Sequence, residues 1–252
     1  MIPKIVHYVW LGGKELNPLG QKCLASWEKY LPGWEIRRWD ESNSPVDHPF
    51  VRKMLREGKY AFASDYVRLH ALVQQGGLYV DTDLELKKRP PSSMLDGKSL
   101  ILGFHSVQNR LSKCALATCW IAAPPGQVLL RRILDRYEGL RRAVINNTFF
   151  TEEILPLFSG RSLPPGGRFD FLEAGGVRIH HRDLFAPEGG QPVQAGFAES
   201  VAVHHGQGCW GGPADTLPWW RRLYDFRLDR KILRPVENSI RKLRALISNS
   251  SP

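Results

Sequence analysis

Two aspartates separated by one residue are the side chains best suited to chemistry in this sequence. Asp81 and Asp83 follow a short apolar strand at residues 78–80, and the strand resumes at residues 84–86. Carboxylates this close repel each other, so each requires water or a cation nearby. Oxygen ligands suit Mg²⁺ or Mn²⁺, and such an ion can bridge to a diphosphate and stabilise it as a leaving group. A solvated turn is the alternative interpretation of the tripeptide taken alone.

The elements before this pair are predicted to form a parallel α/β unit. Residues 2–10 are rich in β-branched and aromatic side chains and precede Gly12-Gly13, which is typical of a buried strand that runs into a loop. A helical pattern at residues 18–30 separates this strand from a second one at residues 34–39, with no tight hairpin between them. A helix at residues 60–75 then ends at a Gly-Gly pair, because a left-handed helix cap favours glycine.

The rest of the sequence adds elements that complete a mixed sheet flanked by helices. Further strands are predicted at residues 100–104, 116–122 and 201–205. Further helices are predicted at residues 49–57, 127–142 and 148–158. The expected fold class is therefore α/β, with one domain over residues 1–218.

The composition is that of a globular protein with an excess of positive charge. The chain has 252 residues, 42% of them hydrophobic, and a formal net charge of +10. This charge favours anionic partners such as nucleotides, acidic glycans or a membrane surface. The four cysteines show no C-x-x-C spacing, so we expect free thiols in a reducing compartment rather than a zinc site. The sequence opens without the apolar run of a signal peptide, and no segment has the roughly 20 apolar residues that span a bilayer. We therefore expect a cytoplasmic location.

The C-terminal stretch carries more than half of the excess charge. Residues 219–252 contain nine Lys or Arg and three Asp or Glu, a net of +6. Apolar residues recur at helical spacing beside the basic ones, which predicts a basic amphipathic helical extension. Such a helix can lie on an anionic membrane surface, peripherally on its inner face, or it can dock on the domain with its basic face in solvent. The sequence supports both interpretations equally.

Two motifs around the aspartates resemble those of glycosyltransferase family 32. This family groups yeast mannosyltransferases with bacterial capsule and lipopolysaccharide transferases, and the clostridial glucosylating toxins have similar motifs. The family pattern is S-D-x-x-R followed by G-G-x-Y-x-D-x-D. In this chain the matching residues are Ser64, Asp65, Arg68, Gly76, Gly77, Tyr79, Asp81 and Asp83. The resemblance implies a GT-A-like fold with a Rossmann-type sheet.

The two ends of the domain resemble the same family. Residues 2–13 are similar to its opening I-P-K-I-I-H-x-x-W, which implies that Trp10 stacks on the donor base; a core tryptophan is the alternative. Residues 203–210 resemble its closing H-H-x-x-G-S-W segment, with Cys209 where serine is usual. By this resemblance His205 is the third metal ligand and Trp210 closes over the phosphates. A histidine pair in the core or on the surface is the alternative.

The resemblance also implies roles for the residues of the central motifs. Asp83 would bind the metal, and Asp81 would face the ribose, the donor sugar or the metal. Asp65 and Arg68 would hold sugar hydroxyls, and the planar guanidinium can also reach a phosphate oxygen. Two further residues are expected in the donor site, with a core position as the alternative for the tyrosine: Ser64 and Tyr79.

The expected activity is metal-dependent transfer of a hexose from a nucleotide sugar. A UDP-sugar is the favoured donor and GDP-mannose the alternative, with Mn²⁺ or Mg²⁺ as the ion. The acceptor would be a glycan or a lipid-linked saccharide in surface polysaccharide synthesis, and the anomeric configuration would be retained. A non-catalytic nucleotide-sugar or glycan-binding protein stays open, as does a hydrolase with paired carboxylates. Nucleic acid is not an expected partner, because neither a basic-aromatic sheet pattern nor a zinc module is present.

Overall fold

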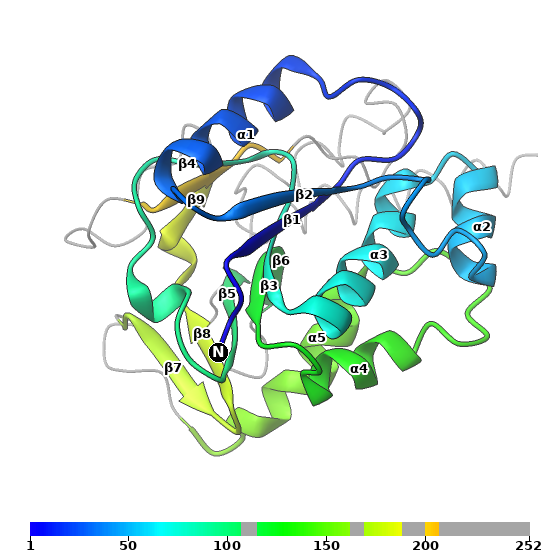
Figure 1. The fold of residues 1–252 in the computed structure, drawn as a ribbon. Coiled ribbons are helices and arrows are strands. Elements are labelled where there is room, and N and C mark those ends of the chain that lie inside the picture. The colour runs from blue at the N-terminus through cyan, green and yellow to red at the C-terminus, as the bar shows by residue number, and fades with distance from the viewer. Residues whose placement is uncertain (107–114, 162–168, 188–199, 207–252) are drawn as a thin grey trace, which may run out of the picture. The chain divides into compact units, whose positions relative to one another are not determined.

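The structure is a computed structural model that describes residues 1–106, 115–161, 169–187 and 200–206 (Figure 1). These residues lie within one unit of the chain, Met1–Trp210. The predicted basic extension at residues 219–252 lies outside the described residues, so it and its boundary at residue 218 stay predictions. No helix in the described part of the chain is long and apolar enough to cross a membrane.

A seven-stranded mixed sheet runs through this unit in the order β2-β1-β3-β6-β5-β8-β7. Its strands are β1 (Ile5–Val9), β2 (Glu35–Trp39), β3 (Gly77–Val80), β5 (Leu100–Ser106), β6 (Ala115–Ala123), β7 (Phe171–Ala174) and β8 (Val177–His180). Strand β1 is parallel to both β2 and β3, as the predicted α/β unit requires, and β6 is antiparallel to β3 and β5. Strands β8 and β7, which the sequence patterns did not predict, extend the sheet beyond β5.

A second sheet of three short strands begins where the first sheet ends. Its order is β4-β10-β9, with β4 at Leu84–Leu86, β10 at Ala202–His204 and β9 at Phe185–Pro187. The chain leaves the large sheet after Val80 and enters the small sheet at Leu84. The Asp81–Asp83 loop is therefore the first place where the chain passes from the large sheet to the small one.

Helices bury both faces of the large sheet (Figure 1). They are α1 (Pro18–Tyr30), α2 (Pro49–Arg56), α3 (Tyr60–Gln75), α4 (Val128–Asp135) and α5 (Asn146–Ile154), with short 3₁₀ turns at Ser92–Met94, Leu155–Phe158 and Arg182–Leu184. Side chains of successive strand residues point to opposite faces, so Tyr79 of β3 packs in one core cluster while Leu78 and Val80 pack in the other. The first cluster includes α2 to α5, and the second includes Trp27 of α1.

Two predicted helices are bounded differently in the structure. The helix expected at residues 127–142 stops at Asp135, and turns follow, with Gly139 at a φ of +69°. The helix expected at residues 148–158 begins earlier, at Asn146, and continues past Ile154 as a 3₁₀ turn that contains Pro156. Proline lacks the N–H that an α-helix needs and clashes with the preceding turn, which accounts for this change.

Glycines fix the passage from α3 into β3. Gly76 has a φ of +63° and Gly77 a φ of +101°. A Cβ on Gly76 would lie 2.5 Å from the backbone nitrogen of Pro125, and one on Gly77 would lie 2.6 Å from the carbonyl oxygen of Ile5. Only glycine allows both the conformation and the close approach. This turn sets the start of the strand that leads to Asp81.

Candidate functional site

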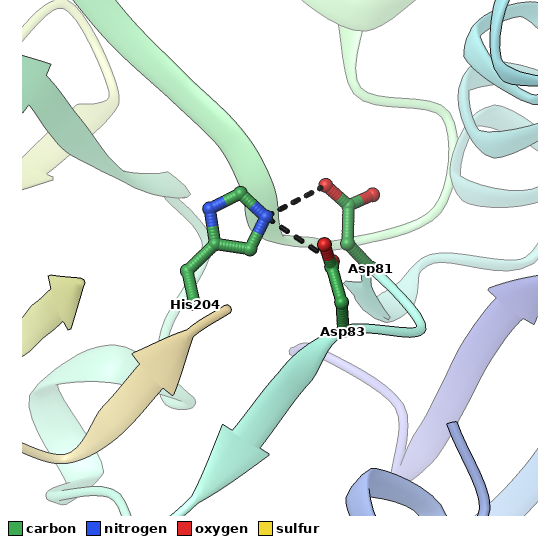
Figure 2. Close-up of side chains that lie close together, drawn as sticks. All are labelled: Asp81, Asp83 and His204. Carbon is green, nitrogen blue, oxygen red and sulfur yellow. Dashed lines mark ion pairs between the residues drawn. The ribbon is translucent and has the colours of Figure 1, made fainter. Parts of the chain in front are cut away.

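Three polar side chains converge where the two sheets meet (Figure 2). Asp81 and Asp83 lie on the loop between β3 and β4, and His204 is the last residue of β10, opposite Leu84 of β4. The Nε2 atom of His204 lies 3.2 Å from Oδ1 of Asp83 and 3.8 Å from Oδ2 of Asp81. One potential ligand atom from each residue lies within 4.8 Å of the other two. The group is partly open to solvent, as a ligand site must be.

The donor atoms of this group fit a divalent cation. Carboxylate oxygens suit Mg²⁺ and Mn²⁺, and an imidazole nitrogen is an acceptable Mn²⁺ ligand. Although burial alone would lower it, the hydrogen bond to Asp83 and the charges of Asp83 and Asp81 raise the pKa of His204. The negative charge of the two aspartates therefore favours a positive charge nearby, which the imidazolium form of His204 can supply. A divalent cation would take over that role.

The structure corrects the expectation that His205 belongs to this group. His204 faces Asp81 and Asp83, whereas Nε2 of His205 lies 3.0 Å from Oε2 of Glu85. Neighbouring residues of an extended chain point to opposite faces, so only one histidine of the pair can reach the aspartates. Which one does so depends on the pairing of β10 with β4, which no local pattern reveals.

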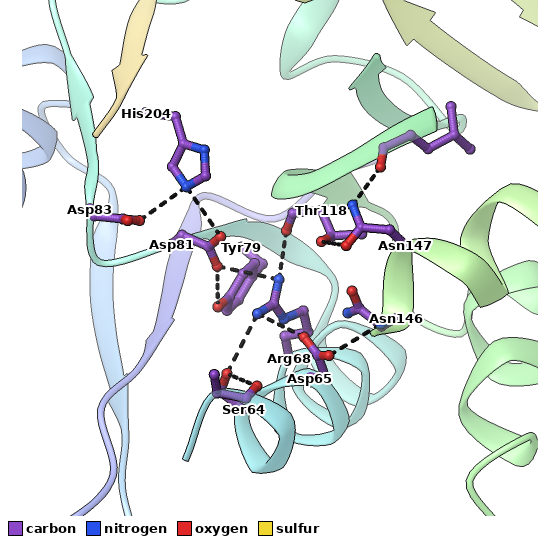
Figure 3. Close-up of polar contacts among 12 residues, drawn as sticks. Ser64, Asp65, Arg68, Tyr79, Asp81, Asp83, Thr118, Asn146, Asn147 and His204 are labelled. Atoms are coloured by element: carbon purple, nitrogen blue, oxygen red, sulfur yellow. Dashed lines mark hydrogen bonds and ion pairs between the residues drawn. The ribbon is translucent and has the colours of Figure 1, made fainter. Parts of the chain in front are cut away.

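A buried arginine connects the aspartates to helix α3 (Figure 3). The guanidinium of Arg68 lies 3.0 Å from Oδ1 of Asp65 and 3.3 Å from Oδ1 of Asp81. It also donates to the carbonyl oxygen of Thr118 on β6 at 2.8 Å. The hydroxyl of Tyr79 donates to the same Asp81 oxygen at 2.8 Å, and the guanidinium lies 4.5 Å from the centre of the Tyr79 ring. Asp81 is therefore shared by the arginine network and the Asp81–Asp83–His204 group.

The charges of this network are closed off from solvent on the helix side. Asp65 is fully buried and Arg68 is 2% exposed. Burial raises the pKa of Asp65 well above its usual range, against the opposing effect of Arg68. Burial would lower the pKa of Arg68, but the nearby Asp81, Tyr79 and Asp65 outweigh it and raise the pKa, so the guanidinium stays charged. One fixed positive charge therefore sits between two acids, and Asp81 is the more exposed of them.

The remaining predicted residues lie farther from this network or outside the described chain. The Ser64 hydroxyl donates to the carbonyl oxygen of Ala61 and accepts a long 3.5 Å contact from Arg68. Trp10 follows β1 and is half-buried, and its Nε1 donates to the carbonyl oxygen of Lys14 at 2.8 Å. The expected role of Trp210 falls outside the described residues and stays a prediction.

Besides His204, three residues of this site were not predicted from the sequence: Thr118, Asn146 and Asn147. The backbone N–H of Asn146, at the start of α5, donates to Oδ2 of Asp65 at 3.3 Å. The Asn147 amide donates to the carbonyl oxygen of Leu116 at 2.6 Å and accepts from the Thr118 hydroxyl at 3.4 Å (Figure 3). The paired asparagines were the only local signal, because their contacts to α3 and β6 join residues far apart in the chain.

The chain matches one protein family over part of its length. Residues 19–100 match the profile described as a glycosyltransferase sugar-binding region containing a DXD motif. This segment includes Ser64, Asp65, Arg68, Asp81 and Asp83. A comparison with curated proteins finds no match.

Two solved glycosyltransferase structures are similar at low sequence identity. PaToxG glycosyltransferase is 17% identical with a TM-score of 0.47, covering 63% of this chain and 72% of that one. A glycosyltransferase involved in the glycosylation of the major capsid of PBCV-1 is 12% identical with a TM-score of 0.41, covering 73% and 85%. Both scores lie below 0.5, so the family match carries the classification, and the mixed sheet flanked by helices agrees with the expected GT-A-like architecture. Residues 19–100 therefore match the DXD-containing sugar-binding region of glycosyltransferases, which supports an enzyme of the glycosyltransferase class.

Proposed function

We propose that this protein is a metal-dependent glycosyltransferase that moves a hexose from a nucleotide sugar to a glycan or glycolipid acceptor. The observation that carries this proposal is the group Asp81, Asp83 and His204, which shares Asp81 with the buried Arg68 network. A UDP-hexose is the favoured donor, with GDP-mannose as the alternative. We place the reaction in surface polysaccharide synthesis, in the cytoplasm and at the inner face of the membrane.

The three residues of the group would hold Mn²⁺ or Mg²⁺. When bound, such an ion neutralises negative charge on the departing diphosphate and so stabilises the transition state of transfer. Asp83 and His204 face each other at the end of the small sheet, with Nε2 of His204 3.2 Å from Oδ1 of Asp83, and would bind the ion from two segments of the chain. Asp81 has a second task, because its Oδ1 also accepts from Tyr79 and pairs with Arg68.

Arg68 and Asp65 are almost fully buried, so they would orient the donor sugar next to this ion through Asp81. The contacts of Arg68 with Asp65, Asp81 and Thr118 come from three different elements, so its guanidinium is held rigidly. A rigid network positions reacting groups at little further entropic cost when the donor binds. The resemblance to family 32 implies that the anomeric configuration is retained, and we propose that the acceptor attacks on the same face of the sugar from which the diphosphate departs.

Nucleotide release with a panel of UDP- and GDP-sugars tests the proposal. The purified chain with Mn²⁺ is expected to hydrolyse one donor slowly, and EDTA is expected to stop it. Asp83→Asn should lower the rate by roughly a hundredfold or more, because the charge that binds the ion is lost. Asp47→Asn is the matched control, since the Asp47 side chain is 96% exposed and forms a surface ion pair with Arg52.

The outcomes separate the proposed enzyme from a non-catalytic binding protein. Metal-dependent donor binding without turnover, even with saccharide acceptors added, would favour the binding protein. Turnover that is unaffected by both EDTA and Asp83→Asn would contradict the metal site. A chain that neither binds nor turns over any donor would contradict the whole proposal.

A further inference from the structure

A second cluster of charges lies directly beside the metal-binding candidates. Glu85 is on β4, two residues after Asp83, and is only 7% exposed. Its carboxylate lies 2.7 Å from Nζ of Lys87, 3.0 Å from Nζ of Lys22 and 3.0 Å from Nε2 of His205. Although burial alone would raise it, these three hydrogen bonds lower the pKa of Glu85 to about 2. Glu85 is therefore a carboxylate whose oxygens are already engaged by neighbouring cationic and N–H groups.

His205 contacts the segment that carries Asp83 through both its backbone and its side chain. Its backbone N–H donates to the carbonyl oxygen of Asp83 at 2.9 Å. Its ring nitrogen Nε2 faces Oε2 of Glu85 at 3.0 Å and must donate, because a carboxylate only accepts. Residues 83 and 85 therefore hold His205 from two directions.

These contacts extend the pairing of β10 with β4 by one residue. The strand itself has only three residues, and its register ends at His204 opposite Leu84. The ends of short elements with few contacts open at low free energy, so a further contact after His204 stabilises this end. The bonds to His205 come immediately after His204 and point to the opposite side from its ring.

We propose that the Glu85–His205 pair positions His204 for the divalent cation. By holding the end of β10, the pair keeps Nε2 of His204 near Asp83 and Asp81, at the distances of 3.2 Å and 3.8 Å. Neither Glu85 nor His205 touches the ion; both are positioning residues, as partners behind metal ligands commonly are. The inference rests on the metal site of the proposed function. It also assigns a role to the histidine that does not reach the aspartates.

Mn²⁺ binding to the full chain tests this role without requiring turnover. Calorimetry and the Mn²⁺ electron paramagnetic resonance signal both measure this binding. His205→Ala is expected to weaken Mn²⁺ binding about tenfold, the lower end of the effect of such partners. His205→Gln keeps an N–H that can reach Glu85 and should bind within about threefold of the unchanged protein. Glu85→Leu removes the acceptor and should weaken binding as His205→Ala does.

His180→Ala is the matched control for a purely structural effect. His180 is also buried, and its Nε2 faces the carbonyl oxygen of Ser93 at 3.2 Å, on a strand of the other sheet. We expect this variant to lower the melting temperature while leaving the Kd for Mn²⁺ unchanged. The positioning role is overturned if the Kd for Mn²⁺ is unchanged in His205→Ala. It is also overturned if His180→Ala weakens Mn²⁺ binding as much as His205→Ala does.

The same titrations distinguish failure of this inference from failure of the proposed function. Mn²⁺ binding that is abolished by Asp83→Asn but unaffected by His205→Ala overturns the inference alone. No Mn²⁺ binding by the unchanged protein, with or without nucleotide sugar, overturns the metal site and the positioning role together.

Discussion

At the scale of single residues, one guanidinium organises the site. Arg68 contacts an acid on its own helix, an acid on the loop after β3 and a carbonyl oxygen on β6. Since each contact comes from a different part of the chain, a change at Arg68 would disturb all three at once. Lysine could not replace it, because an ammonium group lacks the planar fork that reaches several acceptors together.

The Asn146 side chain, beside this network, gives a prediction about stability. The residue is fully buried, and neither its Oδ1 nor its Nδ2 has a hydrogen-bond partner among the residues that the structure describes. Unsatisfied buried polar atoms destabilise a fold, and an apolar group of similar shape removes that cost. Asn146→Leu is therefore expected to raise the free energy of unfolding by about 1 kcal/mol, measured by denaturant titration.

The neighbouring asparagine is the control for this prediction. Asn147 has a similar size and lies on the same helix, but its amide bonds Leu116 and Thr118. Asn147→Leu should lower stability, because it leaves these partners unsatisfied. Destabilisation by both substitutions would contradict the prediction.

His7 gives a prediction about pH. It is buried on β1; Trp39 Nε1 donates to its Nδ1 at 3.0 Å, and its Nε2 donates to the carbonyl oxygen of Gly76 at 2.8 Å. Burial is the main cause that lowers its pKa from 6.5 to about 4. Between these values the unfolded chain binds more protons than the folded one, so stability rises with pH. The contribution of His7 is fully present above pH 6.5 and is lost as the pH falls towards 4, by at most about 3 kcal/mol.

Unfolding curves at pH 4, 5, 6 and 7 check this pH dependence. His7→Gln can keep both hydrogen bonds without titrating, so its stability should change less with pH than that of the unchanged protein. His70, His180 and Glu85 also have a lowered pKa and contribute to the slope that remains. An identical slope in the variant would exclude His7 as a source.

At the scale of elements, the function depends on the loop at which the chain passes from β3 of the large sheet to β4 of the small sheet. The N–H of Asp81 donates to the carbonyl oxygen of Cys119 on β6, and the N–H of Leu84 donates back to Asp81. These bonds fix the loop at both of its ends. The acidic pair is thereby held at the carboxyl end of β3, where open α/β sheets commonly bind ligands.

Gly76 should tolerate substitution far less than a glycine of the same φ elsewhere. Its φ of +63° and ψ of −159° form a conformation that is essentially restricted to glycine, and a Cβ would lie 2.5 Å from Pro125 N. Gly76→Ala is expected to cost about 3 kcal/mol or more. Gly58 has a φ of +66° with nothing within 4 Å of the added Cβ, so Gly58→Ala should cost only about 1 kcal/mol. Denaturant titration of both variants checks the difference, and equal costs would show that the close approach to Pro125 is unimportant.

The elements that the sequence predicted are those with local patterns. The first strand, α1, β2, α2, α3 and the Gly-Gly stop all follow from periodicity and caps within the segment itself. The roles of Asp65, Arg68, Asp81 and Asp83 followed from the resemblance, and the structure brings these residues together. His204, Thr118 and Asn146 could not be identified this way, since their contacts join residues 50 to 121 positions apart. Strand register and helix docking decide such contacts, and neither leaves a period in the sequence.

At the scale of the whole molecule, the basic residues are unevenly distributed, and this allows local membrane binding to be distinguished from attraction by net charge. Residues 219–252 carry a net +6 of the total +10, so residues 1–218 carry only +4. If the basic stretch binds an anionic membrane, its charges should contribute more to membrane binding than an equal number of charges elsewhere on the chain. If only the net charge matters, the position of the charges should be irrelevant.

Two variants with the same change in net charge test this difference. One replaces Arg241, Lys242 and Arg244 by Gln, and the other replaces Lys98, Arg141 and Arg142, which are exposed in the structure. Each lysine or arginine near an anionic bilayer contributes about 1 kcal/mol. We therefore expect the first variant to bind vesicles containing an anionic lipid at least about tenfold more weakly than the unchanged protein, and the second to bind nearly as well. Cosedimentation with anionic and neutral vesicles measures this, and high salt should weaken binding because it screens the charges.

An equal loss of vesicle binding in both variants would indicate attraction by net charge alone. No vesicle binding by the unchanged protein would favour the alternative, in which the basic stretch docks on the protein itself.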